Sequence, residues 1–192
     1  MHNLKIAKTK HPVLDLIKNR WSARSFSDQP ISEQQMHTII EASNWAFSAI
    51  NEQPWRYIVG HKNTPLFDKL FSVLAGGNQP WCKNAAALVL VLGKKTYTAN
   101  GSTNSTMMHD IGAANMLMTL QANSMEIYSH VMGGFDTVKS ADIFELGDDL
   151  VPVVMIAFGF LEHADKLEEP FKTRELTART RKPLEEFILR KF

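Results

Sequence analysis

The sequence predicts an α+β fold with a central sheet, and three observations carry this prediction. Two nearly continuous apolar runs, residues 85–92 and 151–158, have the length and the Val and Leu content of strands buried on both faces. Residues 106–123 are apolar almost all round at helical spacing, as in a buried or interface helix. Helices and strands interleave along the chain without a strict βαβ repeat, which favours α+β.

Local sequence signals mark the individual helices and strands. Ser32 followed three residues later by Gln35 is a capping-box pattern, and the helix it starts is expected to end near Ala46. Pro54 disfavours helix at the residue before it, and residues 55–59 alternate as a strand does. The remaining elements are expected in this order: helix 65–74 capped by Thr64, strand 127–132, helix 137–146 and a terminal helix after Pro183.

Composition bounds the class of protein. The chain has 192 residues, of which 44% are hydrophobic and 21% charged, and we expect a single domain over residues 1–192. A net charge of +1 argues against nucleic acid and anionic membrane surfaces as partners. The single cysteine, Cys82, excludes an internal disulfide and a multi-cysteine metal site. With no secretory signal and no apolar run long enough to span a bilayer, we expect a cytoplasmic protein.

Nine Met and eleven Phe provide adaptable apolar surface. This surface fits either a subunit interface or simply a Met-rich core. Familiar catalytic motifs are missing, since the sequence has no Gly-x-Ser-x-Gly, Walker A, HExxH or GxGxxG pattern. Hydrolase, P-loop and standard dinucleotide-binding functions therefore lack a motif.

Two basic clusters suggest anion binding. Arg20, Ser22 and Arg24 alternate, so in an extended segment their side chains would line one face. Arg179 and Arg181 repeat this spacing later in the chain. Arginine offers paired hydrogen bonds to phosphate, and two arginines neutralise a dianion better than one. The alternative for both clusters is an ordinary solvated basic surface, because such alternation is common.

Four segments occur in one order along the chain: Arg20-Trp-Ser-Ala-Arg-Ser-Phe26, Ser48-Ala-Ile-Asn-Glu-Gln-Pro-Trp55, Gly133-Gly-Phe-Asp136 and Arg179-x-Arg-Lys-Pro-Leu-Glu-Glu-Phe187. In this order and spacing they resemble the FMN-dependent nitroreductase family, and the resemblance covers nearly the whole chain. It implies a nitroreductase-like domain with a central, mainly antiparallel sheet flanked by helices. It also implies an intertwined homodimer that binds FMN at its interface.

The resemblance assigns the matched residues to parts of FMN. Arg20, Ser22, Arg179 and Arg181 would hold the phosphate and ribityl end, and Trp21 belongs to the same cofactor-binding motif.

At the ring, the resemblance places Arg24 near the N1/O2 edge, where a cation would stabilise the reduced flavin and raise its reduction potential. Asn78 would contact the pyrimidine edge of the ring. Gly133 and Gly134 would face flavin N5 with backbone N–H groups, since a side chain would obstruct that face.

Ser48, Ala49 and Asn51 match the loop that the partner subunit contributes to the same site, although Ala49 lacks a hydroxyl that relatives often carry there. A second departure is Ser124-Met125-Glu126, where many relatives have Gly-Leu-Gly. The region that would cover the substrate is also short. The missing hydroxyl at Ala49 removes one hydrogen bond that relatives can make there. The other two departures leave FMN binding intact and leave the substrate open.

The implied function is that of an FMN-dependent NAD(P)H oxidoreductase. NADH or NADPH would reduce FMN, and a small acceptor such as a nitroaromatic compound or a quinone would then be reduced in a ping-pong cycle. The expected partners are a second copy of the chain and this small-molecule electron acceptor. We expect no catalytic side chain and no metal ligand. The alternatives are enone reduction or reductive dehalogenation at the same site, a non-enzymatic FMN-binding module, and an α+β protein without flavin.

Overall fold

The computed structural model describes the backbone of residues 2–190. Within them, an antiparallel sheet has the order β1-β2-β4-β3. The strands are β1 (Trp55–His61), β2 (Ala87–Lys94), β3 (Ile127–Met132) and β4 (Leu150–Phe160). Strands β2 and β4 are the two central ones, which confirms that the two long apolar runs form central strands. β2 is buried over residues 87–93, whereas β4 is fully buried only over residues 155–159 and is half-buried over residues 150–154. The predicted α+β class with a central antiparallel sheet is likewise confirmed.

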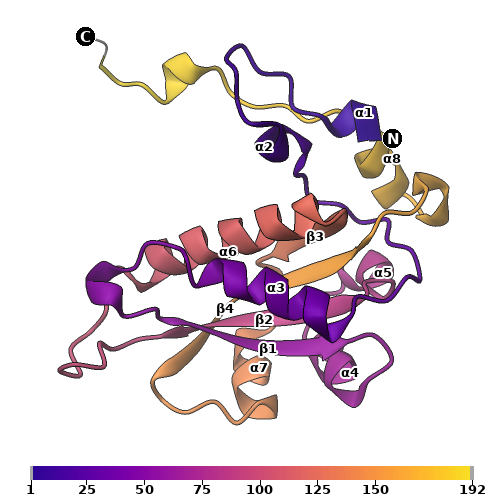
Figure 1. The fold of residues 1–192 in the computed structure, drawn as a ribbon. Helices are drawn as coiled ribbons and strands as arrows, with labels where there is room; N and C mark the ends of the chain where they lie inside the picture. Colours follow the sequence, from indigo (N-terminus) through magenta and orange to yellow (C-terminus); the bar gives the residue numbers. More distant parts are fainter. Residues whose placement is uncertain (1, 191–192) are drawn as a thin grey trace.

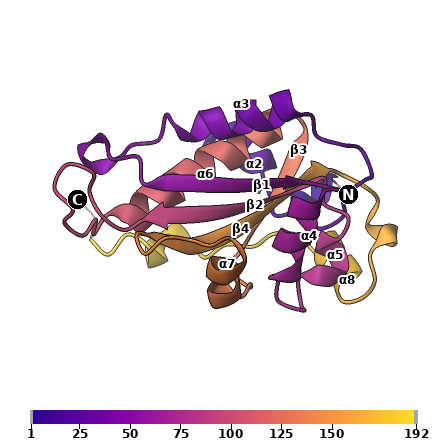
Figure 2. The same ribbon diagram turned by 90° about the horizontal axis from the view of Figure 1, so that it is seen from below.

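Helices cover both faces of the sheet (Figures 1 and 2). The α-helices are α1 (His2–Lys5), α2 (Asp15–Asn19), α3 (Glu33–Ser43), α4 (Pro65–Ser72), α5 (Gln79–Cys82), α6 (Met107–Ser124), α7 (Thr137–Ile143) and α8 (Phe171–Leu176). Three short 3-10 turns accompany them: η1 (Ala49–Asn51), η2 (Ala164–Lys166) and η3 (Leu184–Glu186). None of the described helices has the length and apolar character needed to cross a membrane.

The alternation of side chains along β2 divides the interior into two cores. Leu88, Leu90 and Leu92 face a core built with α4 and α5. Val89 and Val91 face the opposite core, built with α3 and α6. A central strand of this kind must be apolar on both faces, which explains why its sequence reads as a continuous run instead of an alternation.

The helix starts follow their sequence signals. The hydroxyl oxygen of Ser32 accepts a hydrogen bond from the backbone N–H of Gln35 at 3.1 Å, and the Gln35 side-chain oxygen accepts from the Ser32 N–H at 2.9 Å. This is the predicted capping box of α3. Thr64 caps α4 in the same manner, through the N–H of Phe67.

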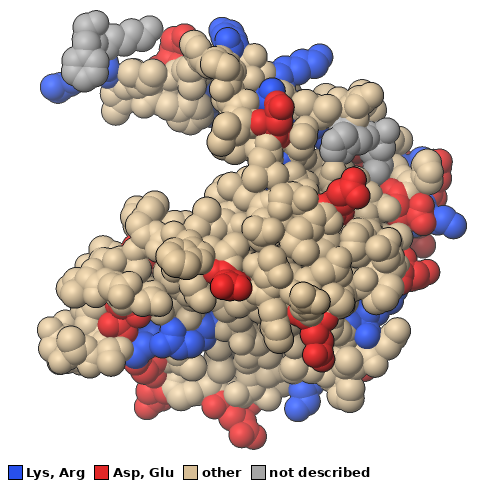
Figure 3. All heavy atoms as spheres, viewed as in Figure 1, with Lys and Arg blue, Asp and Glu red and all other residues tan. Residues whose placement is uncertain are grey.

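The predicted terminal helix after Pro183 is wrong. Only the turn η3 forms there, and Leu184, Phe187 and Leu189 are exposed. A short helix gains most of its stability from packing an apolar face, and this one has nothing to pack against within the described part of the chain. The tail leaves the body of the molecule, and a deep hollow separates the two (Figure 3).

Candidate functional site

The segment from Arg20 to Phe26 is extended and lies along the edge strand β3. Ser22 forms a parallel bridge with Ser129. The residues at positions 21, 23 and 25 are buried, whereas Arg20 and Arg24 are half-buried and Ser22 is exposed. The prediction that Arg20, Ser22 and Arg24 share one outward face is confirmed.

Trp21 is the member of this motif whose side chain points the other way. Its indole is only 2% exposed and packs edge-on against Tyr128, with ring centroids 6.0 Å apart. Alternation in an extended segment explains this, because the neighbour of two outward residues must point inward. The Trp21 side chain is therefore a core residue and is unavailable to a cofactor.

Two buried groups from distant parts of the chain hold this segment. One side-chain oxygen of Glu175, on α8, accepts the backbone N–H groups of Arg24 and Ser25, each at 3.1 Å. On β3, Nδ1 of His130 lies 2.9 Å from the carbonyl oxygen of Ala23. Since a carbonyl only accepts, Nδ1 carries the proton in this contact. Sequence reasoning missed Glu175 and His130, because neither belongs to a motif.

Aromatic rings lie beneath Arg24. Its guanidinium carbon lies 5.9 Å from the centre of the Trp81 ring, and that ring is 4.6 Å from the imidazole of His130. Burial lowers the pKa of His130 to about 4, and the positive charge of Arg24 contributes to this lowering. His130 is therefore neutral near pH 7, so it can lie close to Arg24 without charge repulsion.

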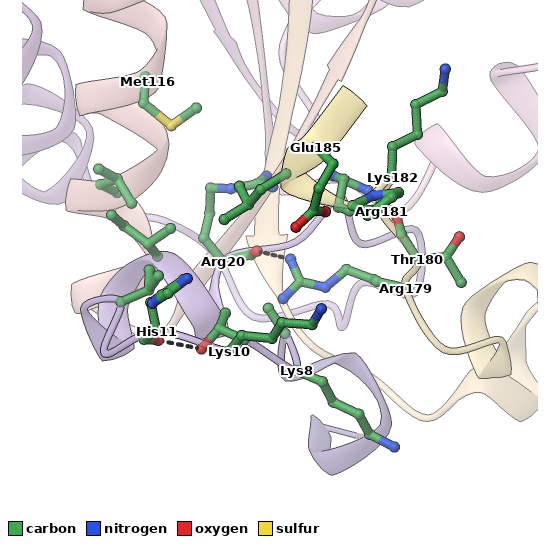
Figure 4. Close-up of a pocket in the computed structure, with 17 residues that line it drawn as sticks. Lys8, Lys10, His11, Arg20, Met116, Arg179, Thr180, Arg181, Lys182 and Glu185 are labelled. Carbon is green, nitrogen blue, oxygen red and sulfur yellow. Dashed lines mark hydrogen bonds between the residues drawn. The ribbon is translucent and has the colours of Figure 1, made fainter. Parts of the chain in front are cut away.

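At the other end of the segment, Arg20 meets the C-terminal tail in a groove of about 660 Å³. Figure 4 shows the side chains of Arg20, Arg179 and Arg181 gathered along this groove. Burial lowers the pKa of Arg20 and of Arg179, and each of these pKa values is lowered further by the neighbouring guanidiniums. The groove thus brings together like charges that repel one another.

Besides lining the groove, Arg179 bonds to the backbone of the Arg20 region. Its two terminal nitrogens donate hydrogen bonds to the backbone carbonyls of Arg20 and Lys18, both at 2.5 Å. Its Nε is buried and has no hydrogen-bond partner in the described part of the chain. Arg179 therefore ties the tail to the Arg20 segment, and the guanidiniums of Arg20 and Arg181 are the ones with fewer bonds to the protein itself.

The structure brings Asn78 and the Gly133-Gly134 turn together. The Asn78 amide nitrogen donates to the carbonyl oxygen of Gly134 at 3.0 Å, and the N–H of Ala75 donates to the same oxygen at 3.0 Å. A Cβ on Gly134 would lie 3.0 Å from that Asn78 nitrogen, whereas a Cβ on Gly133 would meet no atom within 4 Å. The Gly133 position borders open space, as a backbone surface approached by a planar ring would require.

The loop that carries Ser48, Ala49 and Asn51 lies elsewhere. It follows α3, at the end of the molecule opposite α5 and α8 (Figures 1 and 2). Within the loop, Ser48 Oγ accepts the N–H of Gln53 at 2.7 Å. The N–H of Ala49 donates to the Asp110 carboxylate on α6 at 2.8 Å, and the Glu52 carboxylate accepts from Lys94, at the end of β2, at 3.0 Å. A single chain therefore does not join this loop to the other predicted site residues.

Comparison with known proteins agrees with this arrangement. The model of the nitroreductase family matches residues 17–160, well over half of the chain. The chain is 27% identical to the major NAD(P)H-flavin oxidoreductase of Aliivibrio fischeri over 92 residues, which are 46% of this chain and 42% of that protein. The match thus spans less than half the length of that relative.

Solved structures extend the likeness to nearly the whole chain. A crystal structure described as an oxidoreductase containing FMN superposes with a TM-score of 0.88 at 30% identity, covering 92% of this chain and 90% of that one. A nitroreductase family protein from Streptococcus pneumoniae superposes with a TM-score of 0.73 at 20% identity, covering 92% and 98%. The second likeness concerns the fold alone. By its sequence match, its antiparallel α+β fold and these neighbours, the chain belongs to the nitroreductase family.

Proposed function

We propose that this protein is an FMN-dependent NAD(P)H oxidoreductase that acts as a homodimer of single-domain subunits. The observation that carries the proposal is the gathering of Arg20, Arg179 and Arg181 in one groove. Guanidiniums that repel one another are stabilised by an anion between them, and a phosphate accepts paired hydrogen bonds from arginine. Membership of the family, together with the FMN of the 30% identical oxidoreductase, supports FMN as the source of that phosphate.

In this proposal Arg20 and Arg181 bind the phosphate, with Ser22 as a hydroxyl donor on the same face. Arg179 contributes chiefly by fixing the tail, since its terminal nitrogens already donate to backbone carbonyls. The hydrogen bonds support this division, because Arg181 donates a single bond to the protein, to the carbonyl of Thr180 at 2.8 Å, whereas Arg179 donates two.

The ring of the cofactor would lie farther along the segment 20–26, between Arg24 and the Gly133-Gly134 turn. Arg24 would stabilise negative charge at the pyrimidine edge, and the oxygen of the Asn78 amide remains available there because its nitrogen donates to Gly134. Bound FMN would supply hydride transfer between NAD(P)H and a small acceptor. The chain itself binds, orients and provides charge, and no side chain acts as acid or base.

The homodimer places Ser48, Ala49 and Asn51 of one subunit over the site of the other. Two features support this. Trp45, Phe47 and Ile50 expose large apolar side chains around this loop, and Phe187 and Leu189 are exposed on the tail. Apolar side chains gathered in this way mark an interaction surface.

Purified protein with a flavin absorption spectrum, bleached without oxygen by NADH or NADPH, is the expected result. Reoxidation by a nitroaromatic compound or a quinone would complete the cycle. Protein that binds FMN but is bleached by neither nucleotide would be a binding module instead. Reoxidation only by an enone or a halogenated compound would favour those alternative reactions.

The double variant R20A/R181A tests the phosphate assignment. We expect its affinity for FMN to fall by about a hundredfold or more, since each lost charge-assisted contact costs about 1.5–3 kcal/mol. Affinity for riboflavin, which has no phosphate, should change far less. Equal losses for both ligands, or no loss for FMN, would refute the assignment. The variant K8A/K10A, which removes cations from the same groove, is the matched control.

A further inference from the structure

Glu175 is a buried carboxylate that no motif explains. It lies on α8 and is 0% exposed. One of its oxygens accepts two backbone N–H groups, those of Arg24 and Ser25. Its other oxygen, Oε2, is buried and has no hydrogen-bond partner within the described residues. A carboxylate in this position is costly, because burial without full pairing destabilises the charged form.

The groups around Glu175 are cationic. Lys5 donates hydrogen bonds to the carbonyls of Arg174 and Thr177, at 2.9 and 2.6 Å, and so caps the C-terminal end of α8. Its ammonium also lies 4.9 Å from the centre of the Trp21 ring. Burial raises the pKa of Glu175, whereas the N–H groups of Arg24 and Ser25 and the charges of Lys5 and Arg24 lower it. Burial is the larger influence, so the pKa of Glu175 is raised overall. The two N–H groups and the nearby cations Lys5 and Arg24 offset part of the cost of ionising this buried carboxylate.

Together with His130, Glu175 fixes the backbone on both sides of the Arg24 peptide bond. His130 holds the carbonyl of Ala23, and Glu175 holds the next two N–H groups along the chain. Three backbone groups within residues 23–25 are therefore bonded to buried side chains from other elements. Such support is typical of segments that must present a side chain in one position.

We propose that Glu175 is a positioning residue of the flavin site, which fixes the backbone of Arg24 and partly offsets its positive charge toward the bound cofactor. The proposal rests on the proposed function. The reduced flavin is more negative than the oxidised form, so the net positive charge at Arg24 decides how much more tightly the reduced form binds. A negative charge close behind Arg24 lowers that preference.

Two substitutions separate the two tasks of Glu175. In E175Q the side-chain oxygen can still accept the two N–H groups, but the charge is gone. In E175A both the hydrogen-bond acceptor and the negative charge are lost. Glu168, which is exposed and precedes α8, provides the matched control E168Q.

The first measurement is hydrogen exchange at the backbone amides of Arg24 and Ser25 in protein freed of flavin. We expect E175A to exchange these two amides at least about tenfold faster than the unaltered protein, because two hydrogen bonds to a charged acceptor are lost. E175Q and E168Q should keep most of the protection. Unchanged exchange in E175A would overturn the positioning task.

If E175A does not fold, E175D takes its place, because its side chain is one methylene too short to keep both hydrogen bonds. Faster exchange at Arg24 and Ser25 in E175D supports the positioning task, and unchanged exchange at both amides overturns it.

The second measurement is the ratio of affinities for reduced and oxidised FMN. We expect E175Q to raise this ratio by about tenfold, since about 1.4 kcal/mol of electrostatic difference corresponds to that factor. E168Q should leave it unchanged. An unchanged ratio in E175Q would overturn the charge-balancing task, as a purely structural residue would not move it. If the unaltered protein binds no FMN, the proposed function fails and the charge task with it, while the exchange measurement still decides the positioning task.

Discussion

The extended segment 20–26 and the loop 48–53, which contains the turn η1, differ in what holds them. In the segment the buried residues alternate with outward ones, and Glu175 and His130 bind its backbone. In the loop, Ile50, Asn51 and Gln53 have the positive φ values of 56°, 56° and 51°. Ile50, a β-branched residue that disfavours such a backbone, is also 83% exposed.

This difference indicates two kinds of site residue. Those on the segment are positioned by their own chain and are ready to bind. Those on the loop keep a conformation that costs on the order of 1–3 kcal/mol at each left-handed residue, with apolar side chains toward solvent. We infer that this loop is stabilised further by the partner subunit in the proposed homodimer. Three changes to the chain test the contrast, taken from the largest expected effect to the smallest.

Replacing His130 by Gln should change the pH dependence of stability. The pKa of His130 in the folded protein is about 4, below its ordinary value of 6.5, so the unfolded chain binds a proton more readily. The contribution of neutral His130 to the free energy of unfolding is fully present above pH 6.5, and it is lost as the pH falls toward 4. The loss should be on the order of 3 kcal/mol, measured by urea unfolding at a series of pH values.

In H130Q this part of the pH dependence should disappear, whereas a variant of the exposed His37, H37Q, should retain it. Identical curves for H130Q and the unaltered protein would mean that His130 is not held neutral by its surroundings. Arg24 and Arg20, whose charges face His130, remain protonated throughout this range.

Replacing Asp110 by Ala should make the loop 48–53 less stable. Asp110 is buried, and its carboxylate accepts the N–H of Ala49 at 2.8 Å and contacts Nδ1 of His109 at 3.0 Å. We expect a loss of about 2 kcal/mol in unfolding free energy, since the half-buried N–H of Ala49 is left without its carboxylate acceptor. Hydrogen exchange should accelerate in the loop 48–53 and remain unchanged at Arg24.

The variant H109A, which removes the exposed contact of Asp110 together with the ring contact between His109 and Phe47 but keeps the bond to Ala49, is the control and should have a much smaller effect. Faster exchange at Arg24 in D110A would contradict the independence of the two regions.

Replacing Ile50 by Gly should stabilise the isolated subunit by about 1 kcal/mol relative to I50A, because Gly adopts a positive φ without steric cost. Comparison with I50A isolates the backbone effect, since both variants lack the exposed side chain. Equal melting temperatures of I50G and I50A would show that the left-handed backbone at this position carries no strain.

Local signals predicted much of the fold. The Ser32 capping box, the Thr64 cap and the apolar run of β2 each depend on residues close in sequence, and each is found in the structure. The outward face of Arg20, Ser22 and Arg24 was predictable for the same reason.

Long-range contacts were not predictable. Glu175 reads as one charge in a charged tail, yet it bonds to residues 150 and 151 positions away. His130 bonds to Ala23 across 107 positions. The terminal helix was predicted from an apolar pattern that is present, but the described part of the chain offers no surface for such a helix to pack on. Sequence alone gives the pattern of an element and not its packing partner.

The hydrogen bonds from Glu175 and Arg179 to the segment 20–26 also set the order in which parts of the fold form during protein synthesis. Residues 20–26 leave the ribosome early, whereas Glu175 and Arg179, which hold their backbone together with His130, follow about 150–160 positions later. Contacts this distant in sequence form late, because a long loop must close first. On the nascent chain the sheet can assemble before this segment is fixed, so cofactor capture is expected as one of the last steps of maturation.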